Sequence, residues 1–258
     1  MSHSDHASVS DLGPVIVTGG SRGIGAATVE ALAKAGRPVA FSYASNDAAA
    51  NALCDKIAAS GGKALAVKGD AADPAAVDHL FTACRDQLGP AIGLFANAGI
   101  SGPYCTLEQL SLADLQRVME VNVTGTFLAA QAAIREMTAN ENQKGGAIVF
   151  MSSRAAQLGG GGEWIHYAAS KGAVDSMTVG LANEVGPLGI RVNAVSPGLI
   201  ETELHASSVL SDRLKQKSPQ VPLGRSGTAE EVAETVCWLL SDKASYVSGA
   251  ILNVAGGR

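Results

Sequence analysis

The chain has 258 residues, of which 47% are hydrophobic, and a formal net charge of −5 at pH 7. This content is enough for one large core, and an acidic balance without basic clusters argues against nucleic acid or an anionic membrane surface as a partner. No apolar run approaches the ~18 residues of a membrane span, and the polar first dozen residues do not resemble a signal peptide. We therefore expect a soluble, cytoplasmic protein with a flexible tail at residues 1–12 and a single domain at residues 13–258.

The cysteine pattern indicates neither a disulfide framework nor a metal site. Cys54, Cys84, Cys105 and Cys237 form no CxxC pair, and no Cys/His cluster has zinc-ligand spacing. We expect scattered free thiols in a reducing compartment and no bound metal.

Short apolar runs alternate with longer helical segments along the whole chain. Asp73 followed by Pro74 predicts the start of one helix. Thr228 with Glu231 matches a capping box at the start of another helix, near the end of the chain. Between strand and helix, residues 199–221 are polar and irregular, and we expect them to form a lid over a substrate. The strands are expected at residues 15–17, 39–43, 64–67, 92–95, 147–150, 192–195 and 250–254.

This alternation predicts parallel strands joined by crossover helices. The runs are apolar at successive positions, as in strands that are buried on both faces. The fold class is therefore α/β, with a Rossmann-type doubly wound parallel sheet of about seven strands and helices on both faces.

The segment TGGSRGIG at residues 18–25 lies between the first strand and an alanine-rich helix. A helix N-terminus presents unpaired N–H groups and a partial positive charge, and glycine lets a phosphate approach that backbone closely. Spacing alone also fits an ordinary glycine-rich loop, but the flanking strand and helix favour a pyrophosphate cradle. Its expected members are Gly19, Ser21, Arg22, Gly23, Ile24 and Gly25.

Tyr167 and Lys171 lie four residues apart, which places them on one face of a helix. A phenol has a pKa near 10, and a nearby ammonium lowers it. Taken alone, the pair also fits an exposed tyrosine and a solvated lysine. However, a strand ends upstream in Ser152 and Ser153, and ligands of open parallel sheets bind beyond the carboxyl ends of strands.

Together these stretches resemble the short-chain dehydrogenase/reductase family over residues 14–257. The resemblance rests on TGGSRGIG, ANAG at residues 96–99, VNV at 121–123, the double serine, YAASK at 167–171, SPG at 196–198 and the ending SYVSGAILNVAGG. Within the family, the chain is most similar to bacterial ketoacyl reductases and glucose-dehydrogenase-like oxidoreductases.

The resemblance implies a catalytic set of four residues. Tyr167 is expected to be the general acid/base and Ser153 to hold the substrate oxygen. Lys171 is expected to bind the nicotinamide ribose, and Asn122 to hold a water of a proton relay. One departure is that Ser153 and Tyr167 are fourteen residues apart, one more than in the family pattern, and we expect the glycines at 159–162 to absorb the extra residue. Another is Ala96, which replaces the first asparagine of the family motif.

The resemblance also implies cofactor contacts along the carboxyl edge of the sheet. Asp70 would meet the adenine amine, with Ala71 beside it, and residues 97–99 would flank the adenine ribose. The remaining contacts would come from residues after the sixth strand and from the catalytic helix. The expected set is Asp70, Ala71, Asn97, Ala98, Gly99, Tyr167, Lys171, Pro197, Gly198, Ile200 and Thr202.

The second strand indicates which dinucleotide binds. An acidic residue at its end would bind the ribose 2′-hydroxyl of NAD, but Tyr43 stands there. Arg22 suits a 2′-phosphate, and Ser45 and Asn46 supply further donors. We therefore expect NADP(H) to be preferred, with NAD(H) as the alternative, and Asp47 is the residue that argues against this preference.

Two further groups of residues have side chains that occur in hydrolytic and metal sites. His166 precedes the tyrosine, and we expect it to pack or to contact substrate rather than to serve a hydrolytic triad. Glu201, Glu203 and His205 are expected to belong to the solvated lid rather than to a metal cluster.

Residues 124–139 and 172–186 are apolar around most of the helix, which predicts coverage by subunit contacts. The resemblance implies a homotetramer, with a dimer as the second option. The expected function is NADP(H)-dependent interconversion of a small-molecule carbonyl compound and a secondary alcohol. The alternatives are an NAD-linked alcohol or sugar dehydrogenase and a non-catalytic dinucleotide sensor.

Overall fold

The computed structural model describes residues 13–139, 145–201, 214 and 216–258. The expected tail at residues 1–12, most of the expected lid and Thr202 lie outside the described residues. Seven parallel strands form one sheet in the order β3-β2-β1-β4-β5-β6-β9, which confirms the predicted fold class. The strands are β1 (Val15–Thr18), β2 (Val39–Tyr43), β3 (Ala64–Lys68), β4 (Gly93–Ala96), β5 (Gly146–Met151), β6 (Ile190–Pro197) and β9 (Ile251–Val254).

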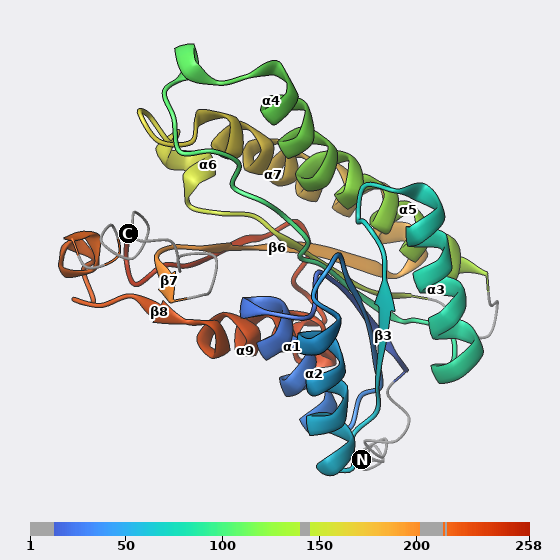
Figure 1. The fold of residues 1–258 in the computed structure, drawn as a ribbon. Coiled ribbons are helices and arrows are strands. Elements are labelled where there is room, and N and C mark those ends of the chain that lie inside the picture. The colour runs from blue at the N-terminus through green and yellow to red at the C-terminus, as the bar shows by residue number, and fades with distance from the viewer. Residues whose placement is uncertain (1–12, 140–144, 202–213, 215) are drawn as a thin grey trace, which may run out of the picture.

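Helices cover both faces of the sheet (Figure 1). One hydrophobic core joins α1, α2 and α9 to one face, and a second core joins α3, α5 and α7 to the other. In β1, Val15 and Val17 point into one core and Ile16 into the other, and all three are fully buried. The helices are α1 (Gly23–Lys34), α2 (Asp47–Ala59), α3 (Pro74–Leu88), α4 (Leu112–Met119), α5 (Gly125–Thr138), α6 (Ala155–Leu158), α7 (Ile165–Val185) and α9 (Ala229–Leu239).

Short elements complete the described part of the chain. A second, two-stranded sheet pairs β7 (Ile200–Glu201) with β8 (Gly227–Thr228). The 3₁₀ helices are η2 (Leu107–Gln109), η4 (Gly186–Leu188), η6 (Ser218–Gln220) and η7 (Asp242–Ala244). No helix within the described ranges has the length and apolar character needed to cross a membrane.

The predicted helix starts are present. The Asp73 side chain accepts a hydrogen bond from the backbone N–H of Ala75, and Pro74 occupies the first turn of α3. Thr228 and Glu231 form the reciprocal capping box of α9. These local signals depend only on residues within one helical turn, which is why sequence spacing identified them.

The helical region that includes Asn122 is interrupted. A π-helical turn, η3 (Glu120–Thr124), separates α4 from α5, and Asn122 lies within it. Widened turns of this kind release backbone groups from the regular ladder and often occur at functional sites.

The strand order places a switch point at β1, which pairs with β2 on one side and with β4 on the other. The chain leaves the two strands toward opposite sides of the sheet, and this opens a crevice at their carboxyl ends. The loops after β1, β4, β5 and β6 therefore meet at one edge of the sheet.

Candidate active site

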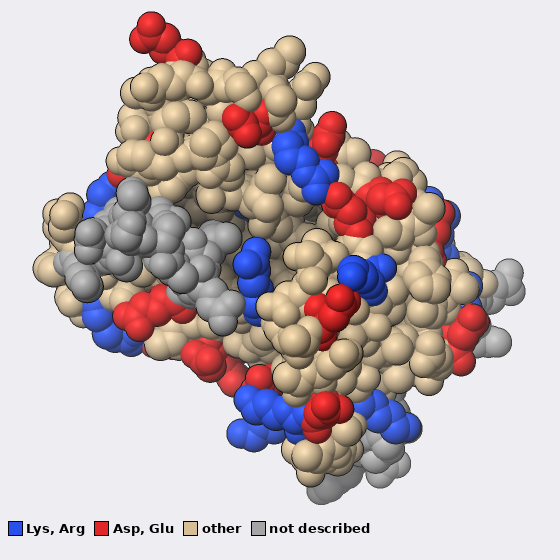
Figure 2. All heavy atoms as spheres, in the orientation of Figure 1, with Lys and Arg blue, Asp and Glu red and all other residues tan. Residues whose placement is uncertain are grey.

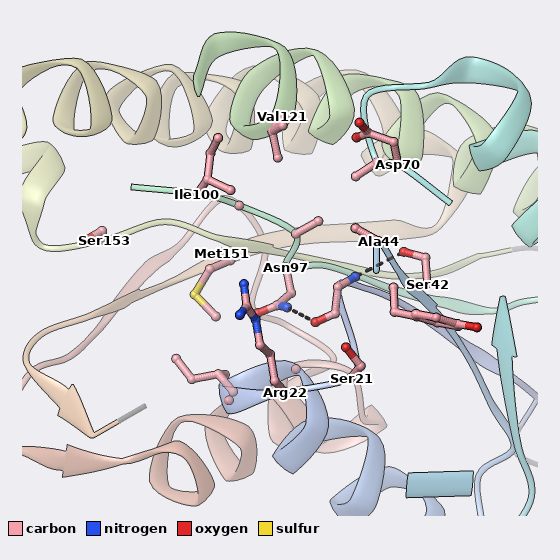
Figure 3. A pocket seen from close by; sticks show the side chains of 18 of the residues that line it. Ser21, Arg22, Ser42, Ala44, Asp70, Asn97, Ile100, Val121, Met151 and Ser153 are labelled. Atoms are coloured by element: carbon pink, nitrogen blue, oxygen red, sulfur yellow. Dashed lines mark hydrogen bonds between the residues drawn. The ribbon is translucent and has the colours of Figure 1, made fainter. Parts of the chain in front are cut away.

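The turn after β1 is shaped by its glycines. Gly19 and Gly23 have φ values of +66° and +55°, a conformation that L side chains rarely adopt. A Cβ on Gly25 would lie 2.3 Å from the carbonyl oxygen of Gly19, so only glycine fits there. Asn97 on the next loop fixes the turn by donating to the carbonyl oxygen of Thr18 at 3.0 Å and to that of Gly19 at 2.9 Å. One of these two bonds is drawn in Figure 3.

The first turn of α1 is open toward the crevice. Arg22 occupies the N-cap position but makes no capping hydrogen bond with its side chain, and no acidic residue stands in the first turn. The N–H groups at this helix end therefore remain available to an anionic ligand. A glycine turn with no room for a Cβ, followed by an open helix N-terminus, fits a pyrophosphate.

The crevice contains a long cavity, which we name the switch-point cavity. Figure 2 shows the molecule hollowed between the layer of α4 and α7 and the layer of α1 and α9, with acidic and basic side chains interspersed around it. Among the residues expected at the cofactor and catalytic sites, the cavity is lined by Gly19, Ser21, Arg22, Gly23, Ile24, Gly25, Ser45, Asp70, Ala71, Asn97, Ala98, Gly99, Ser153, Tyr167, Lys171, Pro197, Gly198 and Ile200.

Ser153, Tyr167 and Lys171 converge in this cavity. The hydroxyls of Ser153 and Tyr167 line the same cavity, and the Ser153 hydroxyl acts on the phenol so as to lower its pKa. The ammonium of Lys171 donates to the carbonyl oxygen of Met151 at 2.7 Å and lies 5.6 Å from the centre of the Tyr167 ring. The end of β5 and one face of α7 therefore hold two hydroxyls and one ammonium together.

Burial changes the acidity of this group in a way that the sequence did not predict. Burial raises the pKa of Tyr167, and the interaction with Ser153 only partly opposes this. Burial also lowers the pKa of Lys171 to about 8, against the attraction of Asp175. The expected lowering of the tyrosine pKa by Lys171 stays a prediction, and the two causes that act on the phenol here are its burial and the opposing interaction with Ser153.

The glycines at 159–162, which were expected to absorb the extra residue, lie in the loop between α6 and α7. Gly159 ends α6 with a φ of +78°, and Gly160 follows with a φ of +62°. A Cβ on Gly160 would lie 2.6 Å from the carbonyl oxygen of Trp164. The tight glycine loop returns the chain to α7, on which Tyr167 lines the same cavities as Ser153.

Asn122 lies beside the cavity and does not line it. Its amide nitrogen donates to the carbonyl oxygen of Ile100 and to Ser170 Oγ, both at 2.9 Å, and its amide oxygen accepts from the Ile100 N–H at 2.8 Å. The side chain is fully buried and fastens the loop after β4 to α7. Its expected part in a water relay stays a prediction.

Charged residues at the adenosine end are paired with one another. Asp70 accepts from Arg117 at 2.6 Å and from the Ala72 N–H at 2.9 Å. Burial alone would raise the pKa of Asp70, but these two hydrogen bonds lower it below its usual value. Arg117, on α4, also lines the cavity. The sequence did not indicate its pairing with Asp70, because the two residues are 47 positions apart.

Arg22 is exposed, and its guanidinium extends toward Asn97 and Met151, away from Ser42 and Ala44 (Figure 3). The sequence predicted that Arg22 would reach the pocket beside Tyr43. In this conformation it does not, and contact there requires rotation of an exposed side chain.

Asp175 was not identified from the sequence, and neither was its contact with Ser152. Ser152 is buried and hydrogen bonds to Asp175, which lies one turn after Lys171 on α7. The four-residue spacing from Lys171 to Asp175 was the available signal. His166 is buried, and its Nε2 lies 3.0 Å from the carbonyl oxygen of Ser101, so it packs against the loop after β4.

A second cavity adjoins the first, and we name it the side cavity. The two cavities share Ser153, Tyr167, Pro197 and Gly198. Trp164 and Leu158 both line the side cavity. The Ser153–Tyr167 pair therefore stands at the junction of two spaces.

The family model described as enoyl-(acyl carrier protein) reductase matches residues 19–258. A solved short-chain dehydrogenase/reductase from Serratia marcescens is 39% identical, with a TM-score of 0.87 over 95% of this chain and 97% of that one. The chain belongs to the short-chain dehydrogenase/reductase family. As a family member it is an oxidoreductase that acts on CH–OH and carbonyl groups.

Relatives within the family differ in activity. An uncharacterized oxidoreductase of Escherichia coli is 46% identical over 94% of this chain and 98% of its own length. Glucose 1-dehydrogenase 2 of Bacillus subtilis is 37% identical over 94% and 93%. A 3-oxoacyl-[acyl-carrier-protein] reductase of Aquifex aeolicus is 39% identical over 94% and 95%. A blue fluorescent protein from a metagenomic library, solved with NADPH, is 38% identical with a TM-score of 0.87 over 95% and 97%.

Proposed function

We propose that this chain is an NADP(H)-dependent oxidoreductase that interconverts a carbonyl compound and a secondary alcohol. The observation that carries the proposal is the convergence of Ser153 and Tyr167 beside Lys171, at the junction of the two cavities. One cavity has the glycine cradle of a dinucleotide, and the other offers space for a substrate.

The cradle formed by Gly19, Gly25 and the first turn of α1 would hold the pyrophosphate. Lys171 would bind the ribose next to the nicotinamide, and Pro197, Gly198 and Ile200 would line its far side. When bound, the nicotinamide supplies or accepts the hydride.

The protein residues supply position and a proton. Ser153 donates a hydrogen bond to the substrate oxygen and fixes it beside Tyr167. Because burial raises the pKa of Tyr167, the phenol stays protonated at neutral pH and acts as the acid in carbonyl reduction. The cationic form of Lys171 then stabilises the phenolate that remains.

Preference for NADP(H) has support from the charges around the adenosine end. No carboxylate ends β2, and the two nearest acids are paired, Asp70 with Arg117 and Asp47 with Lys68. This leaves the guanidinium of Arg22 to meet a 2′-phosphate after rotation. The metagenomic relative solved with NADPH is consistent with this preference, whereas the glucose dehydrogenase relative keeps NAD-linked sugar oxidation as the alternative.

We also propose a homotetramer of single-domain subunits. Phe127 on α5 and Val179 on α7 are 46% and 47% exposed although both are large and apolar. Partner subunits that pack against these two helices would cover them. Sedimentation analysis tests the assembly directly.

The function is tested by following NADPH consumption with a panel of ketones, for the wild type and for Tyr167→Phe. We expect Tyr167→Phe to lose about 10²- to 10⁴-fold in turnover while it binds NADPH as the wild type does. Equal turnover in the two proteins would contradict the proposed acid. NADPH binding without turnover of any ketone, alcohol or sugar would favour a dinucleotide sensor.

A further inference from the structure

The side cavity begins at the proposed reacting oxygen. It has a volume of about 280 Å³, close to the lower end of the range for small-molecule sites. Because it meets the switch-point cavity at Ser153 and Tyr167, a carbonyl compound bonded to that pair has the rest of its structure in the side cavity.

The described lining of the side cavity carries more positive than negative charge. Its basic members are Arg154, Lys217 and Arg258, and its acidic member is Glu163. Glu163 forms an ion pair with Lys217, so its charge is compensated within the lining.

Arg154 is the cation closest in sequence to the reacting oxygen, since it follows Ser153 directly. Its backbone N–H donates to the carbonyl oxygen of Pro197 at 3.0 Å, which ties it to another wall of the cavity. Its Nε donates to the main-chain oxygen of Arg258 at 2.7 Å. These contacts orient the guanidinium and engage Nε, while its two Nη groups have no hydrogen-bond partner among the described residues.

A guanidinium held in this way matches a carboxylate. Its remaining N–H groups form a planar fork that binds two oxygens at once, and partial burial strengthens such charge-assisted bonds. The apolar part of such a ligand would pack against Trp164. This side chain is 8% exposed and packs edge-to-face with Tyr104, with 4.9 Å between the ring centres.

We propose that the substrate is an oxo acid, or the corresponding hydroxy acid, whose carboxylate binds Arg154 while its carbonyl oxygen binds Ser153 and Tyr167. This inference rests on the proposed carbonyl–alcohol activity and adds the substrate class. The carboxylate is the feature that distinguishes such a substrate from a neutral sugar or a thioester.

The test uses two pairs of probes that differ only in charge: benzoylformate with its methyl ester, and levulinate with its methyl ester. For the wild type we expect a kcat/KM with NADPH at least about tenfold higher for the acid of one pair than for its ester. Arg154→Gln should lose roughly tenfold to a hundredfold on that acid and less than about threefold on the ester. Arg154→Lys should keep part of the activity on the acid, because it retains the charge without the fork.

Two controls separate the site from general effects. Arg135→Gln removes an exposed guanidinium in the last turn of α5, where it is paired with Asp78 at 3.2 Å. This variant should leave the acid-to-ester ratio of kcat/KM unchanged for both pairs of probes. NADPH affinity should be equal in wild type and Arg154→Gln, because Arg154 does not line the switch-point cavity. A second readout is the Kd of benzoate for the enzyme–NADPH complex, which should rise in Arg154→Gln by the same factor.

Equal use of acid and ester in both pairs, or an equal loss on both in Arg154→Gln, would overturn the inference. Turnover of the esters but not of the acids would also overturn it while the proposed function stands. Arg154-dependent benzoate binding without turnover of any carbonyl would mean that the anion site exists and that the proposed function fails. Absence of both turnover and benzoate binding would overturn both.

Discussion

The ammonium of Lys68 lies 3.0 Å from the carboxylate of Asp47, and the same carboxylate accepts a hydrogen bond from Tyr43 at 3.0 Å. The hydrogen bond from Lys68, followed by that from Tyr43, lowers the pKa of Asp47. Asp47 is therefore ionised near neutral pH but paired. Asp47 would disfavour a 2′-phosphate by its negative charge, but Lys68 compensates this charge.

Lys68→Gln should reduce the preference for NADPH over NADH by about twofold to fivefold, because it leaves the Asp47 charge uncompensated near the 2′-phosphate. The effect is small because both side chains are more than half exposed. The measurement is fluorescence titration with each cofactor. The double variant Asp47→Asn/Lys68→Gln should regain the wild-type ratio. Lys56→Gln is the matched control, since it breaks a similar surface pair with Glu30. A double variant as impaired as Lys68→Gln would show that Lys68 does not act through Asp47.

Arg22→Gln should weaken NADPH binding by roughly tenfold to a hundredfold and NADH binding by less than about threefold, because only NADPH carries the 2′-phosphate. The same titrations measure both constants. Arg135→Gln serves again as the control for loss of one exposed guanidinium. An equal loss for the two cofactors would place Arg22 at the pyrophosphate instead.

Ketone reduction should slow as the pH rises through about 8, because Lys171, whose pKa burial lowers to about 8, then loses its charge. The Asp175 carboxylate raises that pKa, so Asp175→Asn should lower it further and move the decline to lower pH. The measurement is kcat/KM against pH for both proteins. Ser152→Ala is the comparison, because it removes a hydrogen bond of Asp175 and keeps its charge. An unshifted profile in Asp175→Asn would exclude this electrostatic role.

Gly25→Ala should abolish measurable NADPH binding and lower the free energy of unfolding by about 1–3 kcal/mol, since its Cβ would lie 2.3 Å from the Gly19 carbonyl oxygen. Gly186→Ala is the control: it is exposed, has helical dihedral angles and meets no atom within 4 Å. It should be neutral or slightly stabilising. Thermal unfolding and fluorescence titration measure the two effects, and normal NADPH binding by Gly25→Ala would contradict the cradle.

Several features followed from short stretches of sequence. The seven strands, the cap at Asp73, the capping box at Thr228 and the glycine turn at residues 19–25 all depend on neighbours within a few positions. The placement of Ser153, Tyr167 and Lys171 followed from the rule that ligands bind at the carboxyl ends of parallel strands. The resemblance to the family added their expected roles.

Other features required the folded chain. The π-helical turn at Asn122 widens a helix whose apolar pattern is continuous, so periodicity did not reveal it. The Arg117–Asp70 pair depends on where α4 crosses the end of β3, and the direction of Arg22 is a choice among side-chain rotamers. The Ser152–Asp175 contact joins a strand end to a helix 23 residues later.

The sequence by itself determined the α/β alternation, the glycine turn and the residue types available for catalysis, because each of these is encoded in local spacing. Only the tertiary structure decided the acidity of Tyr167 and Lys171 and the joining of the two cavities at Ser153. Burial of a charge and the meeting of distant loops depend on how all the elements pack, and the pKa shifts of this site are consequences of that packing.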